Sequence, residues 1–286
     1  MHIATYNIRG RSSFGVAVGD GIVDLRPRMA PRLTSVMDVL RAGALDEVRA
    51  VVAGVRADFP LSEVELLTPV PGGEKILCIG VNYANRDAEL TQAGGNMDAK
   101  YPSMFFKPPN AFVAHNAPIL RPPESEQLEY EGEICLVIGK TGRRIPKERA
   151  LEWVVGVTMC NEGTIRDWIR HGRFNVTQGK AWDATGSMGP WITTDVDLTK
   201  PLHIVCKING EVTQDDTTDH MIFGFADILS YVSTFMTLKP GDIICTGTPV
   251  KLNQKEGERK WLKAGDVFEM TVPEIGTLRN VVKDEK

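Results

Sequence analysis

Residues 128–138 carry acidic side chains directly into an unbroken apolar run, and this combination constrains the fold strongly. The run at 134–138 reads Ile-Cys-Leu-Val-Ile, which indicates a buried strand. Residues i and i+2 of a strand point to the same face, so Glu131 and Glu133 are expected to project together. Ionised carboxylates removed from water need a counter-charge, hydrogen bonds or a bound cation. The pair therefore predicts two ligands of a hard-cation site.

A third acidic ligand is predicted at Glu162, which follows a second apolar run at residues 154–160. Thr164 and Asp167 resemble a capping box, so we expect a helix to begin there and Glu162 to lie in the turn before it. Three carboxylates without His or Cys favour Mg²⁺ or Mn²⁺, which prefer oxygen ligands and keep positions open for water or substrate. We expect a catalytic metal rather than a structural one.

Several separate motifs occur in a fixed order over residues 72–286. They are Gly80-Val81-Asn82-Tyr83-Ala84, Phe106-Lys107-Pro108-Pro109, Tyr130-Glu131-Gly132-Glu133, Asn161-Glu162 with Arg166-Asp167-Trp168, Gly179-Lys180 with Asp183 and Gly189-Pro190-Trp191, and Thr246-Gly247-Thr248-Pro249. Together they resemble the fumarylacetoacetate hydrolase family. The resemblance implies an α+β fold with a mixed β-sheet roll, a homodimer, and Mg²⁺ or Mn²⁺ held by Glu131, Glu133 and Glu162. The family's usual third ligand is Asp, so Glu162 is longer by one methylene.

The chain departs from the family in the short helix expected after Asn82. Arg86 stands where family hydrolases commonly place a His, whereas Glu89, the partner of that His, is retained. A guanidinium cannot accept a proton, so Glu89 is the expected general base, acting on a water. Arg86 is instead suited to binding a second carboxylate, which favours a dicarboxylic substrate. His115 and His171 are the alternative bases.

The resemblance also implies roles for Lys180, Asp183 and Thr248. Lys180 is expected to direct its positive charge at a developing enolate, and Asp183 to orient Lys180 or a water. The Thr248 hydroxyl is expected to donate to a substrate carboxylate. The alternatives are a surface lysine, a turn aspartate and a turn formed by Gly and Pro. Arg166 and Asp167 are compatible with a structural salt bridge and are given no catalytic role.

Composition narrows the class of protein further. The 286 residues are 42% hydrophobic and 24% charged, enough for one large domain with a small appendage. The net charge of -4 and the lack of a basic stripe argue against a nucleic-acid partner. No apolar stretch approaches the ~20 residues that cross a bilayer, and no signal core opens the chain, so we expect a cytoplasmic protein without membrane association. The five cysteines lie in or beside apolar runs and are interpreted as reduced core residues.

The chain is expected to divide at the breaker cluster of residues 69–73. Residues 1–70 are expected to form a small α+β domain, and residues 71–286 are expected to form the catalytic domain. A lid over the site is expected at residues 85–100, with an ordinary surface loop as the alternative. Asn209-Gly210 predicts a tight hairpin, and residues 225–237 predict the one substantial helix of the second domain.

We therefore expect a metal-dependent hydrolase that cleaves a carbon-carbon bond of a 2,4-dioxo acid such as an acylpyruvate. The carboxylate and keto oxygens of such a 2-oxo acid can chelate one metal ion, which polarises the carbonyl. An oxaloacetate-type decarboxylase or an enol-keto or dienoate isomerase on the same site is the first alternative. A non-catalytic ligand-binding relative is the second.

Overall fold

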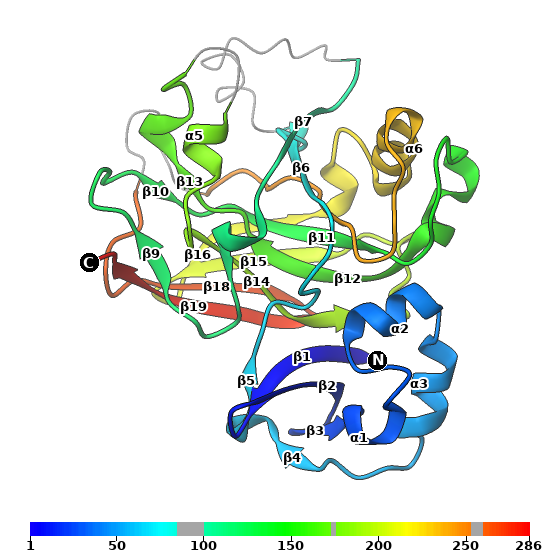
Figure 1. Cartoon of the computed structure of the whole chain (residues 1–286). Helices are drawn as coiled ribbons and strands as arrows, with labels where there is room; N and C mark the ends of the chain where they lie inside the picture. Colours follow the sequence, from blue (N-terminus) through cyan, green and yellow to red (C-terminus); the bar gives the residue numbers. More distant parts are fainter. Residues whose placement is uncertain (85–99, 173–175, 253–259) are drawn as a thin grey trace.

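The computed structural model describes residues 1–84, 100–172, 176–252 and 260–286. It is an α+β protein dominated by short strands (Figure 1), which confirms the predicted fold class. The α-helices are α1 Arg26–Met29, α2 Val36–Ala42, α3 Leu45–Val52, α5 Thr177–Lys180 and α6 Phe225–Phe235. The strands before residue 130 are β1 His2–Ile8, β2 Arg11–Val18, β3 Gly21–Asp24, β4 Phe59–Pro60, β5 Glu65–Leu66, β6 Ile76–Gly80, β7 Ser103–Phe106, β8 Phe112–Val113, β9 Ile119–Arg121 and β10 Leu128–Glu129. The later strands are β11 Gly132–Ile138, β12 Val154–Asn161, β13 Thr164–Ile165, β14 Gly186–Thr193, β15 His203–Ile208, β16 Glu211–Thr217, β17 Ile243–Cys245, β18 Val267–Val272 and β19 Gly276–Asp284.

The larger sheet has the order β4-β3-β2-β1-β14-β12-β11-β17-β6-β7, with β5 on β1 and β8 on β14. Strand β11 lies inside this sheet, between β12 and β17, and all its residues are buried. Its unbroken apolar run is explained by this position, because a strand covered on both faces needs no polar alternation. The pairing of β17 with β6 is parallel and the β11 pairings are antiparallel, so the sheet is mixed.

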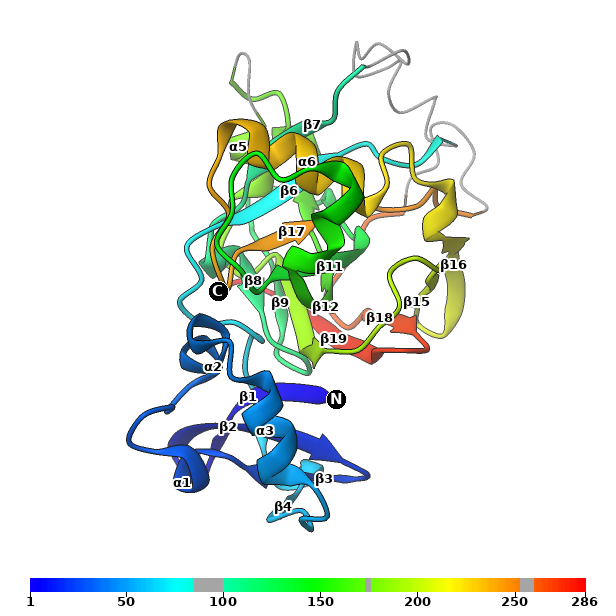
Figure 2. The same ribbon diagram turned by 90° about the vertical axis from the view of Figure 1, so that its right-hand side faces the viewer.

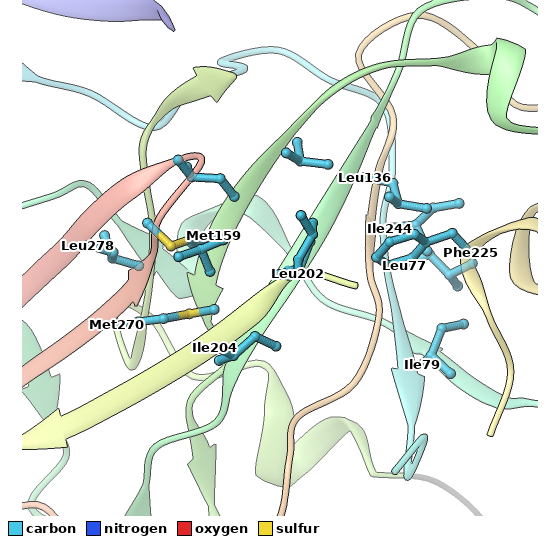
Figure 3. Close-up of a cluster of buried hydrophobic side chains, with 14 of the residues drawn as sticks. Leu77, Ile79, Leu136, Met159, Leu202, Ile204, Phe225, Ile244, Met270 and Leu278 are labelled. Atoms are coloured by element: carbon cyan, nitrogen blue, oxygen red, sulfur yellow. The ribbon is translucent and has the colours of Figure 1, made fainter. Parts of the chain in front are cut away.

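A second sheet of order β16-β15-β18-β19-β9 shares a core with the first. Ile134, Leu136 and Ile138 of β11 belong to this core together with residues of β15, β18, β19 and α6, part of which Figure 3 shows. The alternate residues Cys135 and Val137 belong to another core, which includes the apolar face of α2. The two faces of β11 thus hold the two sheets and the N-terminal helices together.

Residues 1–70 form a β-meander, β1 to β4, with α2 and α3 packed beside it, and lie to one side of the main body (Figure 2). The meander continues the large sheet, because His2 pairs with Thr193 and Ile3 with Ile192 across β1 and β14. Backbone hydrogen bonds therefore join this segment to the rest of the chain. An independent domain ending at residue 70 stays a prediction.

Several local predictions agree with the structure. The hairpin turn falls at Asn209 and Gly210, whose φ angles are 53° and 83°, and α6 occupies most of the predicted helix. The helix expected from Thr164 is wrong: Thr164 and Ile165 form β13, followed by only a short 3-10 turn. Within the described ranges, no helix has the length and apolar character needed to span a membrane.

Candidate metal centre

Glu131, Glu133 and Glu162 converge at one end of the β11 and β12 pair. Glu131 directly precedes β11, Glu133 is its second residue, and Glu162 directly follows β12. These ends meet because the strands are antiparallel, with Gly132 opposite Asn161. One carboxylate oxygen from each glutamate lies within 4.8 Å of the other two, and the three side chains are buried. The structure thus brings the three predicted ligands together.

The backbone around Glu162 is fixed by a tight turn. The Glu162 N–H donates to the Glu131 carbonyl at 2.7 Å, and Asn161 Oδ1 accepts from the N–H of Glu131 at 2.8 Å. Gly163 has a φ of +50°, and a Cβ there would lie 2.2 Å from the Thr185 carbonyl oxygen. Only glycine fits both the conformation and the close approach. The turn therefore holds Glu162 rigidly against the end of β11.

Glu133 receives a hydrogen bond from the backbone N–H of Gly247 at 2.8 Å. Gly247 has a φ of +99°, and a Cβ there would lie 2.7 Å from the Cβ of Asn82. Asn82 in turn donates from Nδ2 to the Thr246 carbonyl at 2.8 Å. Burial, together with Glu162 and Glu131, raises the pKa of Glu133 well above its ordinary value.

Lys180, the last residue of α5, extends its ammonium between two of these acids. Its Nζ lies 2.6 Å from Glu131 Oε2 and also contacts Glu162 Oε2. Burial opposes the charge, but Glu131 and Glu162 outweigh it and raise the pKa of Lys180 above its ordinary value. Lys180 thus lies between Glu131 and Glu162 and contacts both, so it is not the surface lysine of the alternative prediction.

Lys107 is a site residue to which sequence reasoning gave no role. Its side chain has 0% exposure and its Nζ lies 2.9 Å from Glu162 Oε1. The same Nζ also donates to the carbonyls of Glu162 and Gly163, the latter at 2.6 Å. Burial raises the pKa of Glu162 to about 7, even though Lys107 and Lys180 oppose this. The only sequence signal was the motif position of Lys107, between two aromatic residues and two prolines.

An outer group of charges borders the three glutamates. Arg166 Nε lies 3.4 Å from Glu129 Oε2, and Arg166 Nη1 lies 3.9 Å from Glu131 Oε1. Lys251 Nζ pairs with Glu129 Oε1 and lies 4.5 Å from the centroid of the Tyr130 ring. Although burial opposes ionisation, Lys251 and Arg166 hold the pKa of Glu129 below its ordinary value. Arg166 therefore pairs with the acidic cluster rather than with its sequence neighbour Asp167.

The structure separates Asp183 from Lys180. Asp183 is exposed, accepts a hydrogen bond from Asn110 Nδ2, and forms no hydrogen bond or ion pair with Lys180 among the described residues. It lines a surface cavity of about 610 Å³ together with Trp168 and Trp182. An orienting role of Asp183 toward Lys180 is therefore not supported.

Thr248 is buried beside the site and accepts a hydrogen bond from Gln214 Nε2 at 2.8 Å. His115 Nδ1 accepts from the Arg279 N–H at 3.1 Å, whereas His171 lies against Trp168, with ring centroids 4.0 Å apart. Arg86 and Glu89 lie outside the described residues, as does most of the predicted lid.

The chemistry of the buried acids fits a divalent cation. Glu133 is buried with a backbone N–H as hydrogen-bond partner, and among the described residues no Lys or Arg lies within ion-pair distance of it. A carboxylate in that setting is stabilised by a cation. The three side chains offer oxygen ligands alone, which suits Mg²⁺ or Mn²⁺ better than softer metals.

Comparisons with known proteins identify the family of this chain. The sequence model for "Fumarylacetoacetate (FAA) hydrolase C-terminal" matches residues 75–283. The chain belongs to the fumarylacetoacetate hydrolase family. A mitochondrial oxaloacetate tautomerase of Rattus norvegicus is 33% identical over 270 residues, covering 93% of this chain and 85% of that protein. An oxaloacetate tautomerase of Bacillus subtilis is 38% identical over 230 residues, covering 78% of this chain and 75% of that protein.

A solved structure of the same fold is a maleylpyruvate hydrolase from Sphingobium sp. SYK-6 in complex with manganese(II) and pyruvate. It is 26% identical, has a TM-score of 0.80 and covers 100% of both chains. The relatives of this family member thus include enzymes named as tautomerases and as a hydrolase, and these names refer to small organic acids. The predicted homodimer and cytoplasmic location stay predictions.

Proposed function

We propose that this protein is a divalent-metal-dependent enzyme that interconverts the enol and keto forms of oxaloacetate or a similar 2-oxo dicarboxylic acid. The observation that carries the proposal is the buried trio Glu131, Glu133 and Glu162 with the Lys180 ammonium among them. Support for this reaction comes from the two oxaloacetate tautomerases, which match most of the chain. Tautomerisation was the alternative to hydrolysis in the sequence-based prediction.

The reaction moves one proton and shifts two electron pairs. The enol loses its O–H proton, that electron pair forms the C=O bond, and the C=C pair takes up a proton at carbon 3. Bound Mg²⁺ or Mn²⁺, held by the three glutamates, would supply a Lewis acid at the 2-oxo group. Tautomerisation needs no attacking water, so it does not require the His that Arg86 replaces.

The chain's own residues supply the remaining interactions. We assign to Lys180 a hydrogen bond to the enolate oxygen, where negative charge develops, because a fixed ammonium stabilises that charge in a buried site. Thr248 is proposed to bind the substrate carboxylate next to the keto group. Arg86 is proposed to bind the second carboxylate and Glu89 to exchange the proton at carbon 3.

Hydrolysis of an acylpyruvate-type substrate is the second candidate. The manganese and pyruvate complex of the maleylpyruvate hydrolase favours it, because pyruvate is a 2-oxo acid bound in a protein of the same fold. The two reactions share the metal and Lys180 but differ in their need for an activated water. They are therefore distinguished by their products.

The test is an assay with enol-oxaloacetate, an acylpyruvate and keto-oxaloacetate, each with Mn²⁺, with Mg²⁺ and with a chelator. Loss of the enol absorbance is compared with a blank of metal alone, and pyruvate is measured separately. We expect enol loss that depends on enzyme and metal, without pyruvate, and its disappearance in Glu131→Gln. Surface Lys200→Met is the matched control, because Lys200 pairs only with nearby Asp197 in the described structure. If the enzyme released pyruvate from the acylpyruvate but did not accelerate the loss of enol-oxaloacetate, the tautomerase assignment would be refuted.

A further inference from the structure

The carboxylates of the candidate metal centre are matched by an equal number of cationic side chains among the described residues. Each cation lies within 4.0 Å of at least one of the three acids, at distances that include 2.6 Å for Lys180, 2.9 Å for Lys107 and 3.9 Å for Arg166. When all three carboxylates are ionised, their three negative charges and the three positive charges give a net charge of zero. The neighbouring pair of Glu129 and Lys251 adds one charge of each sign and leaves the balance unchanged.

Two of these cations bind the oxygen atoms that would coordinate a metal. Lys180 contacts one oxygen of Glu131 and one of Glu162, while Lys107 lies 2.9 Å from the other Glu162 oxygen. An ammonium and a divalent cation compete for the same lone pairs. Metal coordination by Glu131 and Glu162 would place the ion next to the Lys180 ammonium, and repulsion between the two cations favours the loss of at least one of these Lys180 contacts.

A divalent cation entering this cluster alone would leave two unbalanced positive charges in a buried region. Unbalanced charge is costly there, because water does not screen it well. A dianion that enters with the metal restores neutrality and offers the displaced Lys180 ammonium a new partner. Protonation of any of the acids makes the cluster more positive, so the direction of this effect does not depend on their ionisation.

We infer that the metal ion and a dicarboxylate bind as a mutually dependent pair, with Lys180 exchanging its glutamate contacts for the anion. This inference rests on the proposed function and specifies how its site assembles. The metal alone binds weakly, and the dianion alone lacks its metal contacts. Because coupling between two ligands is reciprocal, each strengthens the binding of the other by the same factor.

The first experiment measures Mn²⁺ affinity by the loss of the free Mn²⁺ signal in electron paramagnetic resonance. Titrations are compared at equal free Mn²⁺ without an anion, with oxalate, and with oxamate, a monoanion of the same shape. We expect oxalate to tighten Mn²⁺ binding about tenfold or more, within the usual range of coupling, and oxamate to tighten it less. Equal Mn²⁺ affinity in the three titrations would overturn the inference.

The second experiment applies the same titration to Lys180→Met, with Lys200→Met as the matched surface control. Removing Lys180 leaves the cluster one charge more negative, so Mn²⁺ alone is expected to bind the variant several-fold more tightly than the unchanged protein. Oxalate is expected to increase the Mn²⁺ affinity of the variant by a smaller factor. Thermal melts of each variant establish that it is folded. A folded Lys180→Met with weaker or unchanged Mn²⁺ binding would contradict the exchange.

The two experiments separate this inference from the proposed function. Tight Mn²⁺ binding that ignores oxalate, together with accelerated enol loss, would refute the inference alone. Coupled binding of Mn²⁺ and oxalate without turnover of any substrate would support the inference and refute the proposed activity.

Discussion

Replacing Lys107 by Met is expected to destabilise the chain in a pH-dependent way. Lys107 and Glu162 are both buried, with side-chain exposures of 0% and 1%, and the substitution leaves Glu162 with one of its two lysine partners. Breaking a buried ion pair costs about 3–5 kcal/mol. This is a large part of the roughly 5–15 kcal/mol that stabilises a typical domain.

The sign of the pH dependence follows from the pKa of Glu162. Its folded-state pKa is raised from 4.5 to about 7, so the folded chain binds more protons than the unfolded chain between these values. Stability from this group therefore falls as the pH rises through that window, and the loss is complete above it. Without Lys107 the pKa rises further, so the cost of the substitution grows with pH.

The assay is urea unfolding of the metal-free protein at about pH 5.5 and about pH 8. At the lower pH Glu162 is protonated, and the cost reduces to unmade buried hydrogen bonds of about 1–3 kcal/mol. At the higher pH we expect the full cost of about 3–5 kcal/mol.

Two further variants complete this test. When Lys107→Met is made in a Glu162→Gln background, its stability cost should be the same at both pH values, because the titrating carboxyl is gone. The exposed control Lys200→Met should change stability by less than about 0.5 kcal/mol. An equal cost of Lys107→Met at both pH values would show that the ionisation of Glu162 does not determine that cost.

Three other predictions follow from the site and the core. Gly247→Ala should lower the melting temperature and the activity together, because its φ of +99° and the 2.7 Å approach to Asn82 exclude a Cβ; an unchanged melting curve would contradict this. Glu133→Gln should raise the melting temperature in chelator at about pH 8, because it removes a buried charge whose pKa is raised, yet reduce the stabilisation by Mn²⁺ in the same thermal scan; a lower melting temperature in chelator would argue against it. A thiol reagent should label all five buried cysteines only after unfolding, as counted by absorbance, and rapid labelling of the folded chain would show that their burial is wrong.

The parts of the fold that sequence predicted are those determined by local pattern. The apolar run of β11, the Asn209-Gly210 turn and the α6 periodicity each depend on neighbouring residues alone. The helix expected at Thr164 failed because Glu129 and Leu128 pair with residues 164 and 165, and this β-pairing overrides the capping signal. The pairing of β1 with β14 joins residues about 190 positions apart, and no local pattern encodes it.

The predictions about the site also succeeded where they depended on local sequence pattern and failed where they depended on distant residues. The three acidic ligands could be proposed from sequence because Glu131, Glu133 and Glu162 each border an apolar run. The role of Lys107 could not be predicted, because a lysine's burial depends on Glu162 and Gly163, which are distant in sequence. The resemblance gave Asp183 the role of orienting Lys180 or a water, yet α5 ends at Lys180 and the two side chains have different partners.

In the proposed site, three glutamates hold one divalent cation beside a 2-oxo acid. The most direct measurement is a crystal structure with Mn²⁺ and oxalate, in which anomalous scattering locates the metal. We expect one anomalous peak about 2.1 Å from an oxygen of each of Glu131, Glu133 and Glu162, with oxalate completing the coordination. A structure with Lys180 still between the glutamates and the Mn²⁺ peak elsewhere would contradict it.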